Sequence, residues 1–572
     1  MLDTLLRGGT LVDGTGAPER RADVGIAEGR IHSVGAVDEP AREVLEVDGL
    51  LICPGFIDPH THYDAQLMWD PAATPSSLHG VTTVIGGNCG FSLAPLASGD
   101  AEYVAQMMSR VEGMPLPALT AGLDWSWRSF GDYLDKLEGN IGVNAGFLVG
   151  HCALRRTAMG KRAVGEVANE QDLAEMQRLL EESLAAGALG LSTTRAFTHT
   201  DGDGEPVASR WASEEELLAL CGAVRAHPGT TLEFMFDGCL KGFSDEEVEL
   251  MTAMSLAAQR PANWNVLTVD ASSDRHVKQI EASKRAAARG ARVVALNMPV
   301  PLELCMSFGS YCALFSLPGW KEVLALPLPE RMERLRDHEL RKELDVAGRS
   351  PEAGVLASLA RWGKYRIGET TAPENAQYAG RMVEEIAREE GRSEIDTVLD
   401  ITLADDLKTR LWPVRDRGGE VVQKAHAELW SSEHVILGGS DAGAHLDRMC
   451  GALYTTVFLS DTLRGETPVS LERAIELLTR APAAHFGLRE RGQVREGYCA
   501  DLAVIDPANL AAGAPERVAD LPGGSERLIS QASGVPHVFV GGVPVVRDGA
   551  LTGARPGTLL RSGRDTDTVT LR

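Results

Sequence analysis

The sequence lacks the features that would place the protein in a membrane or outside the cell. No stretch approaches the roughly 20 consecutive apolar residues of a transmembrane helix. Residues 1–7 lack the basic and then apolar pattern of a signal peptide. The nine cysteines, an odd number at scattered spacings, do not suggest a disulfide framework. These absences predict a protein of the reducing cytoplasm.

An excess of positive charge is also missing. The 56 lysines and arginines are outnumbered by 81 aspartates and glutamates, which gives a net charge of −25. Nucleic acids and anionic membranes attract basic surfaces, so we expect neither as the main partner. A small-molecule substrate and a homo-oligomer are both compatible with this charge. With 572 residues and 44% hydrophobic content, the chain is able to bury a large core.

Two β-rich ends flank a long middle segment. Short strand patterns separated by glycine turns occupy residues 1–54 and 481–560, and we expect the two ends to form one small β-sandwich. Within residues 55–480, strand patterns alternate with helical ones and begin at the end of the first sandwich segment. Eight such units predict an α/β protein with a (β/α)8 TIM barrel, whose active site lies at the carboxyl ends of the strands. The predicted strands span residues 52–57, 81–85, 145–149, 189–192, 231–235, 265–269, 292–296 and 434–437.

The segment at about 300–400 is longer than a crossover between barrel strands requires. It includes a charged helical pattern around residues 331–344. We expect it to be an insertion over the barrel mouth that acts as a lid or a substrate wall. Simple packing on the barrel, or a contact between subunits, is the alternative.

His60 and His62 follow an apolar run over residues 50–57 that is bounded by glycine and proline, which is typical of a buried strand. Residues two apart in a strand point to the same side, so the two imidazoles are placed to bind a divalent metal ion together. Two histidines in a polar turn are the alternative. A second apolar run, over residues 435–439, leads to Asp441. The first and last barrel strands are neighbours, so we expect Asp441 to meet the histidines; a helix N-cap is its alternative role.

These motifs resemble the amidohydrolase superfamily and, within it, the D-aminoacylase (N-acyl-D-amino-acid deacylase) family. The likeness spans nearly the whole length and is carried by residues 54–62, 87–91, 439–445 and 497–504. It implies a metal-dependent enzyme that hydrolyses a linear amide C–N bond, first of all in an N-acyl-D-amino acid. A cyclic amide, imide or carbamate hydrolase is one alternative, and a non-catalytic binding protein that keeps the barrel is another.

The resemblance also implies metal ligands and a mechanism. Cys89 matches the cysteine that ligates zinc in D-aminoacylases in place of the superfamily's modified lysine; a buried apolar role is its alternative. With His60, His62 and Asp441 it would hold zinc, as one ion or two, without excluding another divalent metal. A metal-bound hydroxide would attack the amide carbonyl, and Asp441 would act as general base and then as general acid.

The chain departs from this family where D-aminoacylases carry histidines at the ends of strands five and six. Residues 233–237 and 267–271 contain no histidine. Asp237 and Asp270 lie at or near the expected positions and would offer oxygen ligands, which favour harder ions. Three outcomes stay open: a single ion at the histidine pair, a two-ion site rebuilt with these aspartates, or a degraded site.

Four more residues near the strand ends are predicted to contact the substrate. Arg195 would form a bidentate pair with the free carboxylate of an N-acyl amino acid; a surface ion pair is the alternative. His199 lies on the same loop at the mouth of the barrel. His151 and Tyr63 would orient the substrate or donate hydrogen bonds to it, and burial in the core is the alternative for both.

Overall fold

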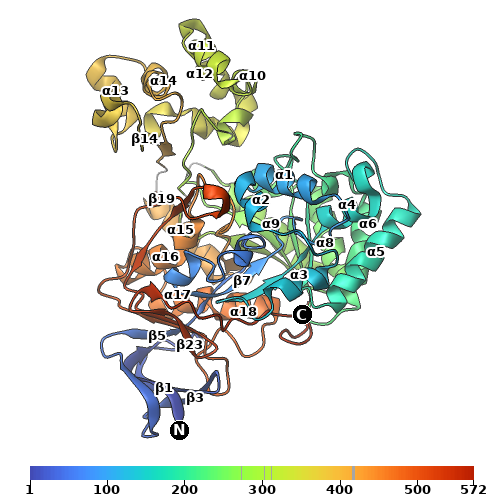
Figure 1. The fold of residues 1–572 in the computed structure, drawn as a ribbon, viewed down its shortest axis with the longest axis vertical. Helices are drawn as coiled ribbons and strands as arrows, with labels where there is room; N and C mark the ends of the chain where they lie inside the picture. Colours follow the sequence, from blue (N-terminus) through green and yellow to red (C-terminus); the bar gives the residue numbers. More distant parts are fainter. Residues whose placement is uncertain (272, 302, 311, 415–418, 572) are drawn as a thin grey trace. The chain divides into compact units, whose positions relative to one another are not determined.

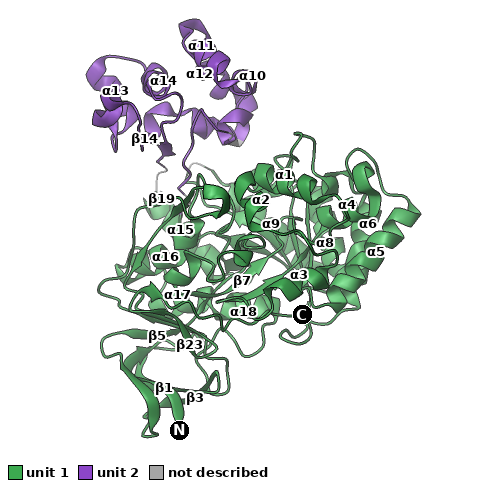
Figure 2. Ribbon diagram, in the orientation of Figure 1, with its two compact units in different colours: residues 1–300, 418–572 green, residues 301–417 purple. Residues whose placement is uncertain are grey.

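The structure is a computed structural model that describes residues 1–572 except 272, 302, 311, 415–418 and 572 (Figure 1). It divides into two compact units, one of residues 1–300 with 418–572 and the other of residues 301–417 (Figure 2). None of the helices in the described residues combines the length and the apolar character needed to cross a bilayer.

Both ends of the chain contribute strands to one nine-stranded sheet. Its order is β24-β23-β22-β17-β5-β1-β2-β3, with β4 beside β1. Strands β5 and β17 pair antiparallel and so join the two ends, drawn blue and dark red in Figure 1. Ile52, Val504 and Phe539 belong to one buried cluster on this sheet. The strands are β1 (Leu2–Leu11), β2 (Arg20–Ala27), β3 (Arg30–Gly35), β4 (Ala41–Glu46), β5 (Leu51–Pro54), β17 (Leu502–Ile505), β22 (His537–Val540), β23 (Val543–Arg547) and β24 (Ala550–Leu551).

A second set of strands in this unit is entirely parallel. One sheet has the order β6-β7-β8 and another the order β16-β13-β12-β11-β10-β9. Only Leu148 separates β8 from β9, and a parallel bridge between Thr61 and Ala442 links the segments that follow β6 and β16. The carboxyl ends of neighbouring parallel strands share one edge. These strands are β6 (Phe56–Asp58), β7 (Val81–Gly86), β8 (Asn144–Phe147), β9 (Val149–Gly150), β10 (Gly190–Thr194), β11 (Thr231–Met235), β12 (Ala262–Leu267), β13 (Val293–Asn297) and β16 (Val435–Leu437).

Helices connect the parallel strands, and several begin where the sequence supplies a capping box. Asn169 and Asp172 cap α5 reciprocally, so both satisfy backbone N–H groups at the start of that helix. The helices of this unit are α1 (Ala101–Val111), α2 (Leu116–Gly122), α3 (Phe130–Leu137), α4 (His151–Met159), α5 (Glu170–Ala185), α6 (Glu214–Arg225), α7 (Gly238–Lys241), α8 (Asp245–Ala258), α9 (Arg275–Ala288), α15 (Gly419–Ser431), α16 (Tyr454–Leu463), α17 (Leu471–Leu478) and α18 (Arg480–Phe486). Short strands β18 (Ala511–Ala512), β19 (Glu516–Val518), β20 (Arg527–Ile529) and β21 (Ala532–Ser533) complete it.

Three of the eight predicted strands differ from the observed ones. The strand predicted at residues 145–149 is divided at Leu148 into β8 and β9, which belong to different sheets. The strand predicted at residues 52–57 is divided, because β5 enters the nine-stranded sheet and β6 enters the parallel set. The strand predicted at residues 265–269 begins too late, since β12 starts at Ala262. Asn263 and Asn265 are both buried inside β12, and these amides interrupt the apolar pattern on which the prediction depended.

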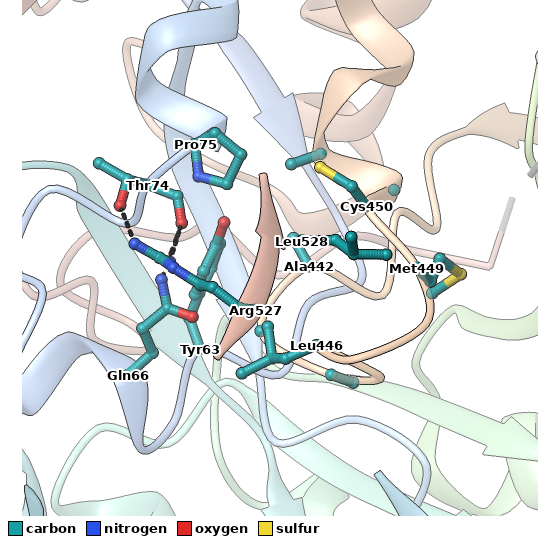
Figure 3. A pocket seen from close by; sticks show the side chains of 14 residues that line it. Tyr63, Gln66, Thr74, Pro75, Ala442, Leu446, Met449, Cys450, Arg527 and Leu528 are labelled. Carbon is teal, nitrogen blue, oxygen red and sulfur yellow. Dashed lines mark hydrogen bonds between the residues drawn. The ribbon is translucent and has the colours of Figure 1, made fainter. Parts of the chain in front are cut away.

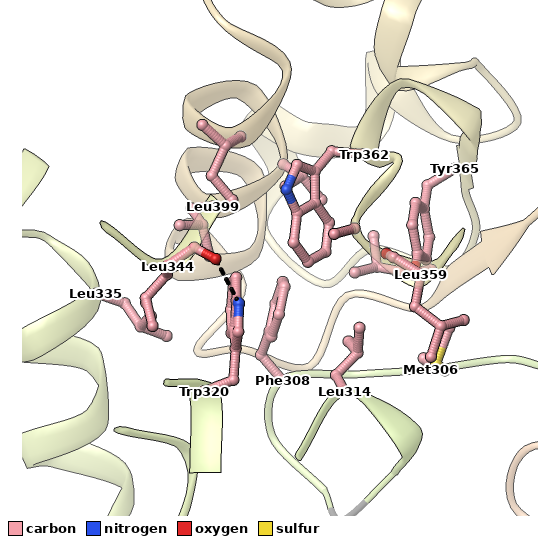
Figure 4. Packing of buried hydrophobic residues seen from close by; sticks show 14 of the residues in the cluster. Met306, Phe308, Leu314, Trp320, Leu335, Leu344, Leu359, Trp362, Tyr365 and Leu399 are labelled. Atoms are coloured by element: carbon pink, nitrogen blue, oxygen red, sulfur yellow. Dashed lines mark hydrogen bonds between the residues drawn. The ribbon is translucent and has the colours of Figure 1, made fainter. Parts of the chain in front are cut away.

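Residues 301–417 pack around an aromatic core of their own (Figure 4). The Trp320 ring stacks on Phe308 with centroids 5.5 Å apart and lies 5.0 Å from Trp362, while its N–H donates to the backbone oxygen of Leu344. The insertion predicted at about 300–400 falls in this unit, and its role as a lid stays a prediction. The unit contains α10 (Trp320–Leu324), α11 (Leu328–Leu335), α12 (His338–Gly348), α13 (Val383–Glu390), α14 (Glu394–Ala404), β14 (Tyr365–Ile367) and β15 (Leu411–Pro413).

Candidate metal centre

His60 and His62 emerge together from the end of β6. Both are buried, with 1% of each residue exposed, and their ring centroids are 5.2 Å apart. The backbone N–H of His62 donates to Ala442, which fixes this turn against the loop that follows β16. Gly443 has a φ of +91°, and a Cβ there would lie 2.5 Å from the backbone oxygen of His62. Only glycine permits this close approach, which brings the two loops together at the histidines.

Asp441 meets the histidines from that second loop. Its Oδ1 lies 3.0 Å from Nε2 of His60 and 3.8 Å from Nε2 of His62. The alternative role as a helix N-cap does not hold, because the next helical turn begins only at Gly451. The segments that follow the first and last parallel strands therefore lie together, as predicted, and bring these three side chains into contact.

Cys89 completes a compact set of ligand atoms. It follows β7, is 6% exposed, and its Sγ lies 3.7 Å from Nε2 of His60. Among the described residues, His60, His62 and Cys89 form a group of candidate metal ligands whose atoms all lie within 4.8 Å of one another. These residues come from two neighbouring parallel strands, as the sequence motifs predict.

Glu233 and Asn265, which the sequence motifs do not mark, reach this group from β11 and β12. The two carboxylate oxygens of Glu233 accept hydrogen bonds from the backbone N–H of Cys89 at 2.8 Å and from Nδ2 of Asn265 at 2.7 Å. Nδ2 of Asn265 also lies 3.6 Å from Sγ of Cys89. An acidic residue in the middle of an otherwise apolar buried strand was the signal for Glu233. Asn265 is the first residue of the strand predicted at residues 265–269, and the prediction sought ligands only at the other end of that strand.

Asp237 and Asp270 lie elsewhere, so the predicted rebuilding of the site with these two aspartates is corrected. The Asp237 carboxylate accepts a hydrogen bond from the backbone N–H of Phe197 and pairs with Lys241 at 2.9 Å. Asp270 follows the end of β12 and is exposed. On β11 and β12 the residues that reach the cluster are Glu233 and Asn265, which lie inside the strands and not after them.

In the metal-free cluster, Asp441 and His62 are in the protonation states of metal ligands, whereas burial raises the pKa of the Cys89 thiol and Asp441, outweighing burial, raises the pKa of His60. Burial raises the pKa of the Asp441 carboxyl, but the hydrogen bond and positive charge of His60 outweigh it and hold that pKa well below its usual range. Burial, together with the charge of His60, lowers the pKa of His62 to about 3. An ionised carboxylate and a neutral imidazole are the forms that bind a metal ion.

Glu112 is a further buried carboxylate at this cluster. It ends α1, is 3% exposed, and its Oε2 lies 3.4 Å from Nε2 of His62. Its backbone oxygen accepts a hydrogen bond from the N–H of His445. The sequence carries no visible signal for Glu112, because it lies in the long connection between β7 and β8 and belongs to no strand end.

His151 and Tyr63, two predicted substrate contacts, have other partners. Both ring nitrogens of His151 are engaged, Nδ1 with Thr193 at 2.9 Å and Nε2 with Glu216 at 2.7 Å. The Tyr63 hydroxyl bonds to Ser76 at 2.7 Å and lines a cavity of about 10 Å³, which has room for one water molecule (Figure 3). Burial in the core, the alternative role of both residues, is what this geometry favours.

Arg195 and His199 occupy the loop after β10. The backbone N–H of Arg195 donates to Met235, and its side chain is partly exposed. Nδ1 of His199 bonds to the hydroxyl of Thr194 at 2.8 Å, and its ring lies 5.3 Å from that of Phe91. Both residues therefore remain available as candidates for contact with a substrate.

Comparison with known proteins decides the family. The model of the amidohydrolase family matches residues 43–546, most of the chain. The chain belongs to the amidohydrolase family. This amidohydrolase is 30% identical to the D-aminoacylase of Alcaligenes xylosoxydans xylosoxydans over 563 residues, which cover 98% of this chain and 97% of the relative. It is 29% identical to the N-acyl-D-aspartate deacylase of the same organism, with 98% and 95% covered.

A solved structure supports the same assignment. It concerns the functional role of the binuclear metal centre in D-aminoacylase, with one-metal activation and second-metal attenuation. That structure is 28% identical, has a TM-score of 0.64, and covers 98% of this chain and 100% of its own. The predicted resemblance to the D-aminoacylase family is confirmed.

The residues of this amidohydrolase fit a divalent metal ion. Two ligand atoms bound to one tetrahedral zinc ion at about 2.0–2.3 Å lie roughly 3.3–3.8 Å apart. The contacts of His60 with Asp441 and Cys89, and of His62 with Asp441, measure between 3.0 and 3.8 Å. Nitrogen, sulfur and oxygen donors in this combination are typical of zinc.

In the metal-free amidohydrolase, the carboxyls of Asp64 and Glu233 should contribute more to stability as the pH falls from 8 to 6. Burial raises the pKa of Asp64 and of Glu233 to about 7. A carboxyl whose folded pKa exceeds its unfolded pKa binds more protons in the folded state, so stability increases as the pH falls through the raised value. Urea unfolding in the presence of a chelator at the two pH values would measure this change.

Buried histidines whose pKa is lowered, such as His62, His79 and His485, act in the opposite direction because they gain protons only in the unfolded chain. A variant is therefore needed to isolate the contribution of the carboxyls. Asp64→Asn should lose part of the gain between pH 8 and pH 6, because one of the two groups no longer titrates. The same change in unfolding free energy between pH 8 and pH 6 in wild type and in Asp64→Asn would contradict the prediction.

Proposed function

We propose that this amidohydrolase is a metal-dependent deacylase that removes the acyl group from N-acyl-D-amino acids. The observation that carries the proposal is the convergence of the buried residues His60, His62 and Cys89 with the partly exposed Asp441. Its relatives include a D-aminoacylase and deacylases of N-acyl-D-aspartate and N-acyl-D-glutamate, which supports this class of substrate.

The same proposal includes a closed (β/α)8 barrel. Its support is the order of the parallel strands in two sheets, β6-β7-β8 and β9 to β16, together with the bridge between Thr61 and Ala442. Only Leu148 separates β8 from β9 in the chain. In this scheme residues 55–480 form the barrel with its insertion, and residues 1–54 and 481–560 form a β-sandwich around the nine-stranded sheet. A barrel places the metal cluster at the carboxyl ends of the strands, where barrel enzymes have their active sites.

The proposed mechanism gives each residue of the cluster a task. A metal ion held by His60, His62 and Cys89 would supply Lewis-acid chemistry, since it polarises a carbonyl and lowers the pKa of water. Asp441, ionised at neutral pH, takes a proton from the water that attacks the amide carbon. It then gives this proton to the leaving nitrogen as the C–N bond breaks. Glu233 holds the backbone of Cys89 and so positions that ligand.

Hydrolysis of paired enantiomers tests the proposed function. Purified protein loaded with zinc, cobalt or manganese should release free amino acid from N-acetyl-D-amino acids and much less from the L forms. Metal content would be measured on the same sample. A metal-loaded protein that cleaves none of the N-acyl-D-amino acids, but opens a cyclic amide or imide, would overturn the proposal.

Replacing Arg195 by alanine should raise KM about tenfold or more for a substrate with a free carboxylate, on the order of 1–3 kcal/mol. The physical reason is the loss of a charge-assisted hydrogen bond to that carboxylate. Steady-state kinetics would measure KM and kcat separately. The matched control is the corresponding N-acyl amino acid amide, which lacks the charge and should show no comparable change. An unchanged KM for the acid would remove this role from Arg195.

A further inference from the structure

Glu112 is buried at the metal cluster without the partners that a buried carboxylate needs. It is 3% exposed, and among the described residues its ion-pair partner is His62, at 3.4 Å. Within the same residues no backbone or side-chain N–H donates a hydrogen bond to its carboxylate. A buried ionised carboxylate is costly unless it is paired or binds a metal. The structure therefore offers this group no compensation apart from the cluster itself.

The side of the His62 imidazole that Glu112 approaches distinguishes a metal ligand from a residue that only orients the ring. A carboxylate that only orients a metal-binding histidine bonds to the ring nitrogen remote from the metal. Glu112 instead approaches Nε2 of His62, the same atom that faces Asp441, while Nδ1 of His62 has no hydrogen-bond partner. Glu112 thus lies on the metal-binding side of the ring, and not behind it.

The spacing agrees with a shared ion. Glu112 Oε2 lies 3.4 Å from Nε2 of His62, close to the roughly 3.3 Å between two ligand atoms on one tetrahedral ion. The local backbone also fixes this position, because the carbonyl of Glu112 accepts a hydrogen bond from the N–H of His445. The loop that carries Asp441 therefore holds Glu112 in place as well.

We propose that Glu112 is a further ligand of the divalent ion at His60 and His62. This half of the site would then offer two imidazoles and two carboxylates, those of Asp441 and Glu112. The inference rests on the proposed metal-dependent function. Added carboxylate makes a ligand set harder, which favours manganese or cobalt relative to a site of histidine and cysteine alone.

Cobalt binding by the variant Glu112→Gln tests the inference. Cobalt would be titrated into protein depleted of metal, and affinity and visible absorption would be recorded. We expect the affinity to fall about tenfold or more, as losses at a metal site commonly do. The absorption spectrum should change as well, because its shape and intensity depend on the number and kind of ligands. Glu112→Asp, which keeps the charge, should retain more of the affinity than Glu112→Gln.

Two further measurements separate a ligand from a structural residue. Metal-free Glu112→Gln should unfold at the same temperature as metal-free wild type or higher, because it lacks an uncompensated buried carboxylate. The rise in unfolding temperature on adding cobalt should be smaller in this variant. Glu102→Gln, an exposed change on the same helix, is the matched control and should leave affinity and spectrum unchanged.

Wild-type affinity and an unchanged cobalt spectrum in Glu112→Gln would overturn the inference. So would a variant that is less stable without metal but binds cobalt normally, since that result marks a purely structural residue. If cobalt binding depends on Glu112 but the wild type cleaves no N-acyl-D-amino acid, the proposed function fails and the ligand role stands. If the wild type cleaves such substrates and Glu112→Gln binds metal normally, the function stands and the ligand role fails.

Discussion

Protein with both His60 and His62 replaced by alanine should lose its metal ion and retain less than about 0.1% of the wild-type kcat/KM. The metal's polarising effect contributes several kcal/mol to catalysis, and each 1.4 kcal/mol is a factor of ten in rate. Both imidazoles are buried, so no other side chain is able to take their place without moving the strand end. Elemental analysis and steady-state kinetics on one preparation would measure both effects.

The matched control is His338→Ala, which removes an exposed histidine from the unit of residues 301–417. It should leave metal content and kcat/KM unchanged. About one metal equivalent in the wild type, lost in the double variant, would favour a single ion at the histidine pair. Two equivalents would mean that the half of the site with Cys89, Glu233 and Asn265 also binds a metal ion. Full activity in the double variant would contradict the proposed mechanism.

Replacing Asp441 by asparagine should lower kcat about a hundredfold to ten-thousandfold, the usual range for a general acid–base group. Asparagine is nearly the same size but cannot accept a proton at neutral pH. Much of the metal should remain, because His60, His62 and Cys89 are unchanged. The measurement is kcat at saturating substrate, together with metal content.

Asp237→Asn is the control for this second prediction. Asp237 also follows a strand end, but its carboxylate bonds to the Phe197 backbone and to Lys241. Its replacement should leave kcat within about twofold, as expected for a substitution away from the reacting atoms. A large loss of kcat in Asp237→Asn with little loss in Asp441→Asn would reverse the roles assigned to the two aspartates.

The sequence was sufficient to predict the residues that leave strand ends at recognisable motifs. His60, His62, Cys89 and Asp441 each follow an apolar run, and the alternation of strands and helices predicts which ends are neighbours. The parallel pairing and the Thr61–Ala442 bridge agree with that reasoning.

The same reasoning could not predict which residues inside strands or in long connections contact the cluster. Glu233 faces the cluster because alternate residues of β11 share one side, which becomes visible only when the strand register is known. Asn265 lies inside the predicted strand as well, whereas ligands were expected only after its carboxyl end. Glu112 arrives from the end of a helix, and no local pattern indicates where such an end lies in space. No sequence pattern around His151 indicates that its buried partner is Glu216, which is 65 residues away.

The pairing of β5 with β17 has a consequence for how the chain is made. During synthesis β5, which precedes β6 and the histidines, emerges early, whereas its antiparallel partner, Leu502–Ile505, emerges only near the end of translation. Contacts between such distant segments form slowly, because a long loop must close first. A nascent chain that stops before residue 500 therefore lacks the strands that pair with β5 on one side of the nine-stranded sheet. We expect shortened products of the gene to be substrates for chaperones and proteases, and not smaller versions of the enzyme.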